Sequence, residues 1–151
     1  MLTVKHLLTF ILASLILAAC STYSEENLKT FDSEIKAYIQ KNNLDMEVSE
    51  TGLYFQIIEE GEGDEILFND VVSFKYTGKL IDGTVFDKQN SPVEFQVKQL
   101  IGAWQEIMTI LKPGGKAFLI APPQLGYGDQ ELDDIPPNSI LIFDIEVVSV
   151  K

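Results

Sequence analysis

A carboxylate and a phenol in the stretch from Val71 to Asp87 are the first residues that suggest chemistry. The first half of this stretch alternates as a β-strand does, with Tyr76 on the apolar face. The next residues, Asp82-Gly83, predict a two-residue hairpin turn. With that turn, Asp87 is the diagonal neighbour of Tyr76 on the apolar face. A carboxylate there needs a hydrogen-bond donor, and a phenol is one. The pair is therefore either a buried structural contact or part of a functional site.

Large apolar side chains along the chain form a second candidate feature. The same hairpin register places Phe86 on the opposite face, so a bulge or a strand end near Phe86 is needed to bring it alongside. The other large apolar side chains of this set come from separate predicted elements, and each is expected to face the interior. The whole set comprises Tyr76, Phe86, Phe95, Leu100, Ile101, Trp104, Tyr127, Ile135 and Phe143. These side chains either fill an ordinary core or line an apolar cleft between a helix and a sheet.

The composition is that of a folded, acidic protein. The chain has 151 residues, of which 46% are hydrophobic and 23% charged, enough for one domain and a short appendage. All 11 basic residues are Lys, against 23 acidic residues, and the formal net charge is −12. Such a chain repels phosphate backbones and has no guanidinium group to contact them, so nucleic-acid binding is not expected. We interpret the acidic surface as favouring solubility rather than a specific cationic partner.

The N-terminal residues resemble an export signal with a lipid attachment site. Lys5 precedes an apolar run, Leu7–Leu17, which suits a signal peptide and is too short for a membrane-spanning helix. The following Leu17-Ala18-Ala19-Cys20 is similar to a bacterial lipobox. This resemblance implies removal of residues 1–19, acylation of Cys20 and anchoring of the chain to a membrane of the bacterial envelope. Ser21 is similar to the residue found in lipoproteins sorted to the outer membrane. The alternative is a plain secretory signal with an incidental Cys.

Histidine and cysteine chemistry is not expected in the domain. His6 is the only His and Cys20 the only Cys, so the processed chain has no His and no free thiol. This excludes Ser-His-Asp and Cys-His nucleophiles and any Cys/His zinc site. No cofactor and no metal ion are predicted.

A helix and a linker are expected between Cys20 and the domain. From Asn27 to about Asn42, apolar residues recur at helical spacing, and Ser24 or Asn27 is the candidate N-cap. This amphipathic helix either lies on the domain or pairs with a second copy of the chain. The predicted organisation is a signal peptide over residues 1–19, a lipidated N-terminus with helix and linker over 20–51, and a domain over 52–151.

The domain is predicted to consist of strands with one helix. Besides the hairpin, strands are predicted at Leu53–Ile58, Val93–Val97, Ala117–Ala121 and Ile140–Val150. Helical spacing over Leu100–Leu111 ends at a Pro-Gly-Gly sequence. Residues 89–92 and 122–137 are expected to be loops. This order predicts an α+β domain, an antiparallel sheet with one helix against it.

Several short motifs follow one another along residues 52–151. They are Tyr76-Thr77-Gly78, Asp82–Asp87, Leu100–Trp104, Gly126-Tyr127-Gly128, Ile135–Asn138 and Leu141–Asp144. In this order they resemble the FK506-binding (FKBP) family of peptidyl-prolyl cis-trans isomerases. The resemblance implies an antiparallel sheet of five to six strands wrapped around one short helix, with a pocket between them.

The resemblance also implies roles for the residues already singled out. Catalytic roles fall on Asp87 as the pocket carboxylate, on Tyr127 as a phenol that hydrogen-bonds the ligand, and on Ile101, whose backbone N–H receives a substrate carbonyl. Substrate-binding roles fall on Tyr76, Phe86, Leu100, Trp104, Ile135 and Phe143, with the Trp104 indole as the pocket floor.

The family resemblance implies rotation of X-Pro bonds, and together with the lipobox-like sequence it implies an isomerase of exported polypeptides, anchored through Cys20 at the outer membrane and facing the periplasm. Its partners would be proline-containing polypeptides, the membrane and an FK506-like ligand, while the oligomeric state stays open. The alternative is a non-catalytic proline-peptide-binding or chaperone module of an envelope complex. The helix and the acidic loop are also similar to features of lipoprotein isomerases associated with gliding motility.

A calcium site is a third hypothesis, on an acidic segment near the C-terminus. Its candidate ligands are Asp129, Glu131, Asp133 and Asp134. The segment lacks the Gly that follows the third ligand of an EF-hand loop, so a solvated acidic loop is the preferred interpretation.

Overall fold

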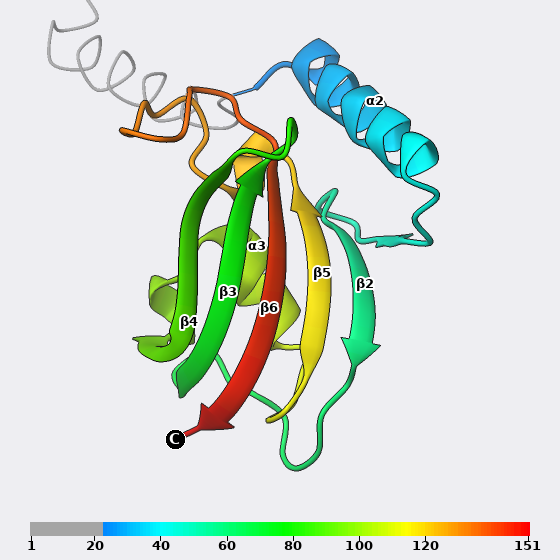
Figure 1. Ribbon diagram of the computed structural model, residues 1–151. Coiled ribbons are helices and arrows are strands. Elements are labelled where there is room, and N and C mark those ends of the chain that lie inside the picture. The colour runs from blue at the N-terminus through cyan, green and yellow to red at the C-terminus, as the bar shows by residue number, and fades with distance from the viewer. Residues whose placement is uncertain (1–22) are drawn as a thin grey trace, which may run out of the picture.

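The protein is described by a computed structural model over residues 23–151. Six antiparallel strands form one sheet in the order β1-β2-β5-β6-β3-β4, and the short helix α3 lies against one face of it (Figure 1). The elements are α2 Glu25–Lys41, β1 Glu47–Val48, β2 Tyr54–Glu59, β3 Val71–Leu80, β4 Val85–Gln96, η2 Val97–Gln99, α3 Gly102–Met108, β5 Lys116–Ala121, η3 Pro123–Leu125 and β6 Leu141–Val150. This confirms the predicted α+β class with a sheet around one short helix. Cys20 and the predicted signal peptide lie outside the described residues.

The main core lies between α3 and the sheet. Strand β6 shows the alternation that the sequence predicts, with Leu141, Phe143, Ile145 and Val147 all buried on the side of α3. The helix contributes Ala103, Trp104, Ile107 and Met108 to the same cluster. Burying one large apolar side chain stabilises the fold by about 1.5–3 kcal/mol relative to exposure. The helix is shorter than the predicted Leu100–Leu111 at both ends, since α3 begins at Gly102 and ends at Met108.

Helix α2 packs against the opposite face of the sheet. Its Ile35 is fully buried among the outward-facing side chains of three strand ends, in a second cluster with Tyr54, Ile120, Ile140 and Ile142. Ser24 caps the N-terminus of α2 by accepting a hydrogen bond from the Asn27 N–H (3.2 Å), and Asn42 is the C-cap. Of the two predicted arrangements, the helix therefore takes the one in which it lies on its own domain.

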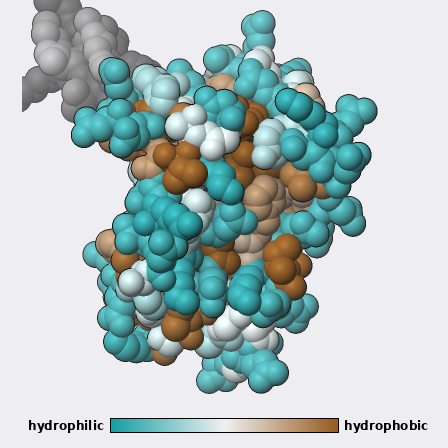
Figure 2. Space-filling model, in the orientation of Figure 1, coloured by the Kyte–Doolittle hydropathy of each residue, from teal (hydrophilic) through white to brown (hydrophobic). Residues whose placement is uncertain are grey.

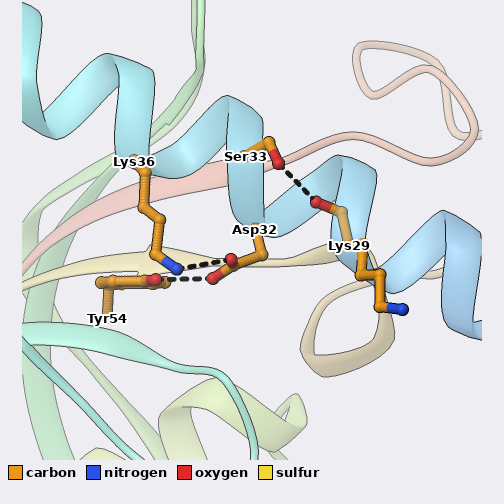
Figure 3. A network of polar contacts seen from close by, with 5 residues as sticks. All are labelled: Lys29, Asp32, Ser33, Lys36 and Tyr54. Atoms are coloured by element: carbon orange, nitrogen blue, oxygen red, sulfur yellow. Dashed lines mark hydrogen bonds and ion pairs between the residues drawn. The ribbon is translucent and has the colours of Figure 1, made fainter.

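A polar network joins α2 to strand β2 beside this second cluster (Figure 3). The Tyr54 hydroxyl donates to Asp32 Oδ1 (2.6 Å), and the Lys36 ammonium donates to Asp32 Oδ2 (2.7 Å). The Ser33 hydroxyl donates to the Lys29 carbonyl within the helix (2.8 Å). Asp32 thus joins one residue of its own helix to one residue of the sheet, which sets how α2 lies on the domain.

The hairpin between β3 and β4 lies where it was predicted, but its turn is wider. Leu80 N–H donates to Thr84 C=O and Gly83 N–H donates to Leu80 C=O, both at 2.9 Å, so Ile81 to Gly83 form the loop. Within this loop, only Gly83 has a positive φ (92°). The predicted two-residue turn, with Asp82 also at positive φ, is wrong. The physical reason is that the Asp82 carboxylate accepts the Thr84 N–H (2.8 Å), which stabilises the longer turn.

Two irregularities bend strand β4. Gly78 pairs with Asp87 and Lys79 with Val85, so Phe86 is the extra residue of a bulge, as the sequence required. A two-residue turn after Ile81 would pair Leu80 with Val85. Lys79 pairs with Val85 instead, because the wider turn shifts the register by one.

The predicted loop at residues 89–92 is also wrong, since β4 continues through it. Phe74 pairs with Val93 and Tyr76 with Gln89, so residues 90–92 oppose Lys75 alone and form a second bulge. Pro92 has no N–H to donate, and a bulge is where a strand tolerates such a residue.

The face of the sheet that turns away from α3 is mostly hydrophilic, with apolar side chains between (Figure 2). Three ion pairs join neighbouring strands on it: Lys75–Glu146 (3.9 Å), Lys79–Asp144 (3.2 Å) and Lys116–Glu59 (3.0 Å). Exposed pairs of this kind each contribute at most about 1 kcal/mol. Within residues 23–151, no helix combines the length and the apolar character needed to cross a bilayer.

Candidate active site

Asp87 and Tyr76 meet on the face of the β3–β4 hairpin that turns toward α3. Asp87 stands opposite Gly78 and diagonal to Tyr76, and the Tyr76 hydroxyl donates a hydrogen bond to Asp87 Oδ2. The Gln89 amide lies 3.4 Å from Asp87 Oδ1. The hydrogen bond predicted between the phenol and the carboxylate is therefore present, and it fixes the direction of the carboxylate.

Three aromatic rings from strands β3 and β6 surround Trp104. The ring centroids of Tyr76, Phe143 and Phe74 lie 4.7, 5.0 and 5.3 Å from that of Trp104, each in an edge-to-face arrangement. Phe86 contacts Phe143 edge-on at 5.8 Å. Pairs of this geometry add about 0.5–1.5 kcal/mol beyond the burial of their area. The rings hold the indole in one orientation beneath Tyr76 and Asp87.

The indole has an unsatisfied polar atom. Trp104 is 8% exposed, and its Nε1 is the one buried side-chain nitrogen or oxygen in residues 23–151 that has no hydrogen-bond partner. A buried donor without a partner costs about 1–3 kcal/mol. Such a cost at the centre of a set of rings marks a candidate functional site rather than plain core.

The segment before α3, Leu100–Ile101, packs against the same cluster. Ile101 is the N-cap of α3, and its carbonyl accepts from the N–H groups of Trp104 and Gln105, both at 3.0 Å. Among the described residues, no acceptor is recorded for the Ile101 N–H. The Gln105 side chain donates to the carbonyls of Leu100 (2.7 Å) and Lys98 (3.2 Å), which holds this segment in place.

The long connection from β5 to β6 contributes the remaining residues. Ile135 is 6% exposed, and its backbone pairs with Leu132 in an isolated bridge. Tyr127 is partly exposed and packs against the main cluster from the other end of this connection. The segment therefore places one phenol and one apolar side chain beside the rings of the sheet.

The two phenols of the site stay protonated over a wide pH range. Burial raises the pKa of Tyr76, and the hydrogen bond and negative charge of Asp87 raise it further. Burial also raises the pKa of Tyr127, followed by the charge of Asp87. Both hydroxyls therefore remain hydrogen-bond donors near neutral pH. The Tyr76 hydroxyl is bound to Asp87, which leaves the Tyr127 hydroxyl as the donor for a ligand.

The comparison with known families agrees with this geometry. Residues 63–148 match the family model described as FKBP-type peptidyl-prolyl cis-trans isomerase. The chain belongs to this family.

Relatives of the FKBP-type domain occur in bacteria. A probable FKBP-type peptidyl-prolyl cis-trans isomerase of Haemophilus influenzae is 46% identical over 111 residues, covering 71% of this chain and 46% of the relative. The isomerase FkpA of Escherichia coli is 34% identical over 151 residues, covering 84% of this chain and 56% of FkpA. The chain thus spans about half the length of the curated relatives it matches.

Solved structures share the fold. The crystal structure of Escherichia coli FkpA is similar with a TM-score of 0.70 and 30% identity, over 99% of this chain and 83% of that one. A peptidyl-prolyl cis-trans isomerase of Pseudomonas syringae has a TM-score of 0.72 and 25% identity, over 88% of this chain and 99% of that one.

The FKBP-type domain brings the predicted site residues together. The main cluster includes Trp104, Ile135 and Phe143 as buried members, with Tyr76, Phe86, Leu100, Ile101 and Tyr127 packed against it, and Asp87 is bonded to Tyr76. Their roles stay predictions. Phe95 is the exception, because it lies on the edge strand and is 48% exposed although it contacts Phe74. Residues 23–151 contain no group of three or more His, Cys, Asp or Glu side chains placed to hold a metal ion, and Cys20 lies outside them.

Three residues of the site escaped the sequence analysis as functional candidates. Gly78 leaves room for two rings, since a Cβ there would lie 2.6 Å from Phe86 Cζ and 3.1 Å from Phe143 Cε1. A glycine inside an alternating strand is a signal of such an approach and was available in the sequence. Gln89 and Gln105 act through hydrogen bonds to Asp87 and Leu100, and the sequence carries no pattern for these contacts.

Proposed function

We propose that this protein accelerates cis–trans rotation of X-Pro bonds in polypeptides. The observation that carries the proposal is that the Asp87–Tyr76 pair lies beside the Trp104 indole, in a cluster against which Ile101 and Tyr127 also pack. The family membership of residues 63–148 supports it.

The reaction needs no nucleophile and no metal ion. Amide resonance sets a barrier of about 18–20 kcal/mol, and X-Pro bonds exchange in roughly tens to hundreds of seconds. A planar amide is more charge-separated than a twisted one. An apolar surface around Trp104 therefore disfavours the planar form relative to the twisted form, and each ~1.4 kcal/mol of that difference is tenfold in rate.

The polar groups at the rim of the apolar surface have separate tasks. The Ile101 N–H and the Tyr127 hydroxyl hold the carbonyls that flank the prolyl bond, so rotation is confined to one amide. Asp87 accepts from Tyr76 and presents its negative charge to the side on which the prolyl amide turns. We infer that the apolar surface and the charge of Asp87 bind the twisted amide more tightly than either planar isomer, whereas the Ile101 N–H and the Tyr127 hydroxyl hold the flanking carbonyls in every state.

A direct test measures exchange of a cis-prolyl peptide by NMR, without a coupled protease. The full-length chain in detergent is expected to raise the exchange rate at substoichiometric concentration, and FK506 is expected to inhibit it. An exchange rate equal to that in buffer contradicts the proposal.

Variants of Asp87 distinguish the isomerase from the alternative function, a non-catalytic binding or chaperone module. For an isomerase, Asp87→Ala lowers the exchange rate while a proline peptide still binds, as measured by Trp104 fluorescence, the only Trp in the chain. Asp87→Asn keeps an acceptor for Tyr76 and controls for misfolding. Asp144→Ala, on the opposite face of the sheet, is the matched control. A binding module loses peptide affinity with Asp87→Ala and shows no exchange activity in any variant.

We further propose that Cys20 is acylated and anchors the protein at the outer membrane, facing the periplasm, where exported polypeptides are its clients. The lipobox-like Leu17–Cys20 sequence supports this proposal. Cys20→Ser is expected to move the protein from the membrane fraction to the soluble fraction and to abolish palmitate labelling. Labelling that persists in Cys20→Ser contradicts it. The association with gliding motility stays a prediction.

A further inference from the structure

The connection between β5 and β6 carries two residues of the site and is closed at one point. Gly128 N–H donates to Pro123 C=O (2.9 Å), and Asn138 N–H donates to Gly128 C=O (2.8 Å). The two arms of this connection therefore meet at Gly128 and Asn138. Tyr127 precedes one of these residues directly, so its phenol follows any movement of the junction.

Tyr23, which precedes the FKBP-type domain in the sequence, contacts this junction. Its hydroxyl donates to Asn138 Oδ1 at 2.7 Å, although the two residues are 115 positions apart. The ring is 9% exposed and packs edge-on against Phe31 of α2, with centroids 5.2 Å apart. Figure 1 shows the segment that leads into α2 beside the orange connection. Helix α2 lies on the sheet through Ile35, so Tyr23 is held by a fixed support.

The space behind the junction is otherwise partly open. A hollow of about 370 Å³ is lined by Tyr23, Leu28, Gln124 and the segment Gly126–Gln130, which includes Tyr127. The Tyr23 hydroxyl lies 3.8 Å from where a Cβ would stand on Gly128. The hydrogen bond from Tyr23 therefore supports the junction from the side of this hollow.

The conformation of Asn138 also needs support. Its φ is +61°, a region that residues other than Gly enter at an energetic cost and that Asn tolerates better than most. Its side chain accepts from Tyr23 while its N–H closes the connection. One residue thus joins the N-terminal segment to the backbone that carries Tyr127.

We propose that Tyr23 is a positioning residue for the prolyl-isomerase site: its hydrogen bond to Asn138 holds the β5–β6 connection so that Tyr127 faces the substrate. This inference rests on the proposed function. Tyr127 holds the ligand in all its states, so a loosened connection weakens binding more than turnover. Tyr23→Phe is expected to raise KM for a prolyl peptide about three- to tenfold with little change in kcat.

The variants isolate one hydrogen bond. Tyr23→Phe removes the hydroxyl and keeps the ring on Phe31. Asn138→Gly removes the acceptor and keeps the positive φ, which Gly adopts freely. The double variant tests whether the two effects share one cause, because a shared hydrogen bond is lost only once. Tyr38→Phe is the matched control, since Tyr38 belongs to α2, which follows Tyr23 in the chain, and packs on the second cluster.

Each variant of the full-length chain is examined by steady-state kinetics, by hydrogen exchange and by urea unfolding. In both single variants, the inference predicts faster hydrogen exchange of the backbone amides at positions 128 and 138 and a raised KM. In the double variant, it predicts no further rise of KM. Tyr38→Phe is expected to match the wild type in exchange at these amides and in KM.

Two failures are distinguishable. If the wild type does not accelerate prolyl exchange, the proposed function fails, whatever hydrogen exchange shows in the β5–β6 connection. If the wild type is active and Tyr23→Phe leaves KM and the Gly128 amide unchanged, the positioning role is wrong. A loss of unfolding free energy in Tyr23→Phe with unchanged KM also overturns the inference, because it assigns Tyr23 a purely structural role.

Discussion

At the scale of single side chains, the two phenols near Asp87 have different tasks. Tyr76 is bound to the carboxylate, whereas Tyr127 packs at the rim and has its pKa raised by burial and by the charge of Asp87. A neutral phenol donates a hydrogen bond to a carbonyl, and a phenolate does not. The distinction leads to a prediction for Tyr127.

We expect Tyr127→Phe to lower kcat/KM for a prolyl peptide about two- to tenfold, because a single hydrogen bond contributes roughly 0.5–1.5 kcal/mol. The NMR exchange assay measures it, with Tyr38→Phe as the control. An unchanged kcat/KM would show that the Tyr127 hydroxyl does not contact the substrate.

Asp32 is the residue whose ionisation stabilises the packing of α2. Hydrogen bonds from Lys36 and Tyr54 hold its pKa below the ordinary value. The unfolded chain takes up the proton near pH 4 and the folded chain at lower pH. The stabilisation is therefore complete above the ordinary carboxyl pKa and is lost as the pH falls through the folded value.

We expect Asp32→Asn to lower the free energy of unfolding at pH 7 by at most about 1 kcal/mol, since the Asp32 side chain is 43% exposed. Urea unfolding at pH 7 and near pH 3 measures the difference, which should shrink at the lower pH. Asp45→Asn, at an exposed position, is the control. An equal loss at both pH values would assign the effect to shape rather than charge.

At the scale of elements, the β3–β4 hairpin decides which side chains reach the site. The bulge at Phe86 turns this ring to the same face as Asp87, and Gly78 leaves space for it. Helix α3 then brings Trp104 against the rings of β3 and β6. The site therefore depends on one irregular strand as much as on its polar residues.

Gly78→Ala is expected to displace Phe86 and to destabilise the fold by roughly 1–3 kcal/mol, the usual cost of overpacking. Urea unfolding followed by Trp104 fluorescence measures both the stability and the change around the indole. Gly102→Ala is the control, because a Cβ there would lie 3.4 Å from its nearest neighbour, Leu125. Equal stability of Gly78→Ala and wild type would contradict the close packing described for Gly78.

At the scale of the whole molecule, the net negative charge influences which polypeptides approach the site. A formal net charge of −12 on 151 residues creates a negative field around the chain. The acidic residues include Asp129, Glu131, Asp133 and Asp134, on the same connection as Tyr127. This field acts on any charged polypeptide that approaches the site, before the prolyl bond is bound.

We expect peptides with Lys next to proline to have a kcat/KM a few-fold higher than peptides with Glu at low ionic strength. The difference should disappear near 0.5 M salt, where charges are screened beyond about 4–5 Å. Kinetics at two salt concentrations measure it, with a neutral peptide as the reference. A preference that persists in salt would indicate a direct contact at short range.

The sequence by itself determined the order of the main strands and helices and the inward face of strand β6. It also indicated most of the side chains that pack around Trp104, with Phe95 as the exception. These follow from local patterns, such as the alternation of Leu141, Phe143, Ile145 and Val147, and the packing confirms them. The hairpin could be located in the same way, because Asp82-Gly83 acts on its immediate neighbours.

Only the tertiary structure decided how distant segments meet. Four features depend on the folded chain as a whole. They are the width of the turn after Leu80, the continuation of β4 through residues 89–92, the packing of α2 on its own domain and the contact of Tyr23 with Asn138. Such contacts are selected by the total burial and hydrogen bonding of the folded chain, and a local pattern does not carry that information.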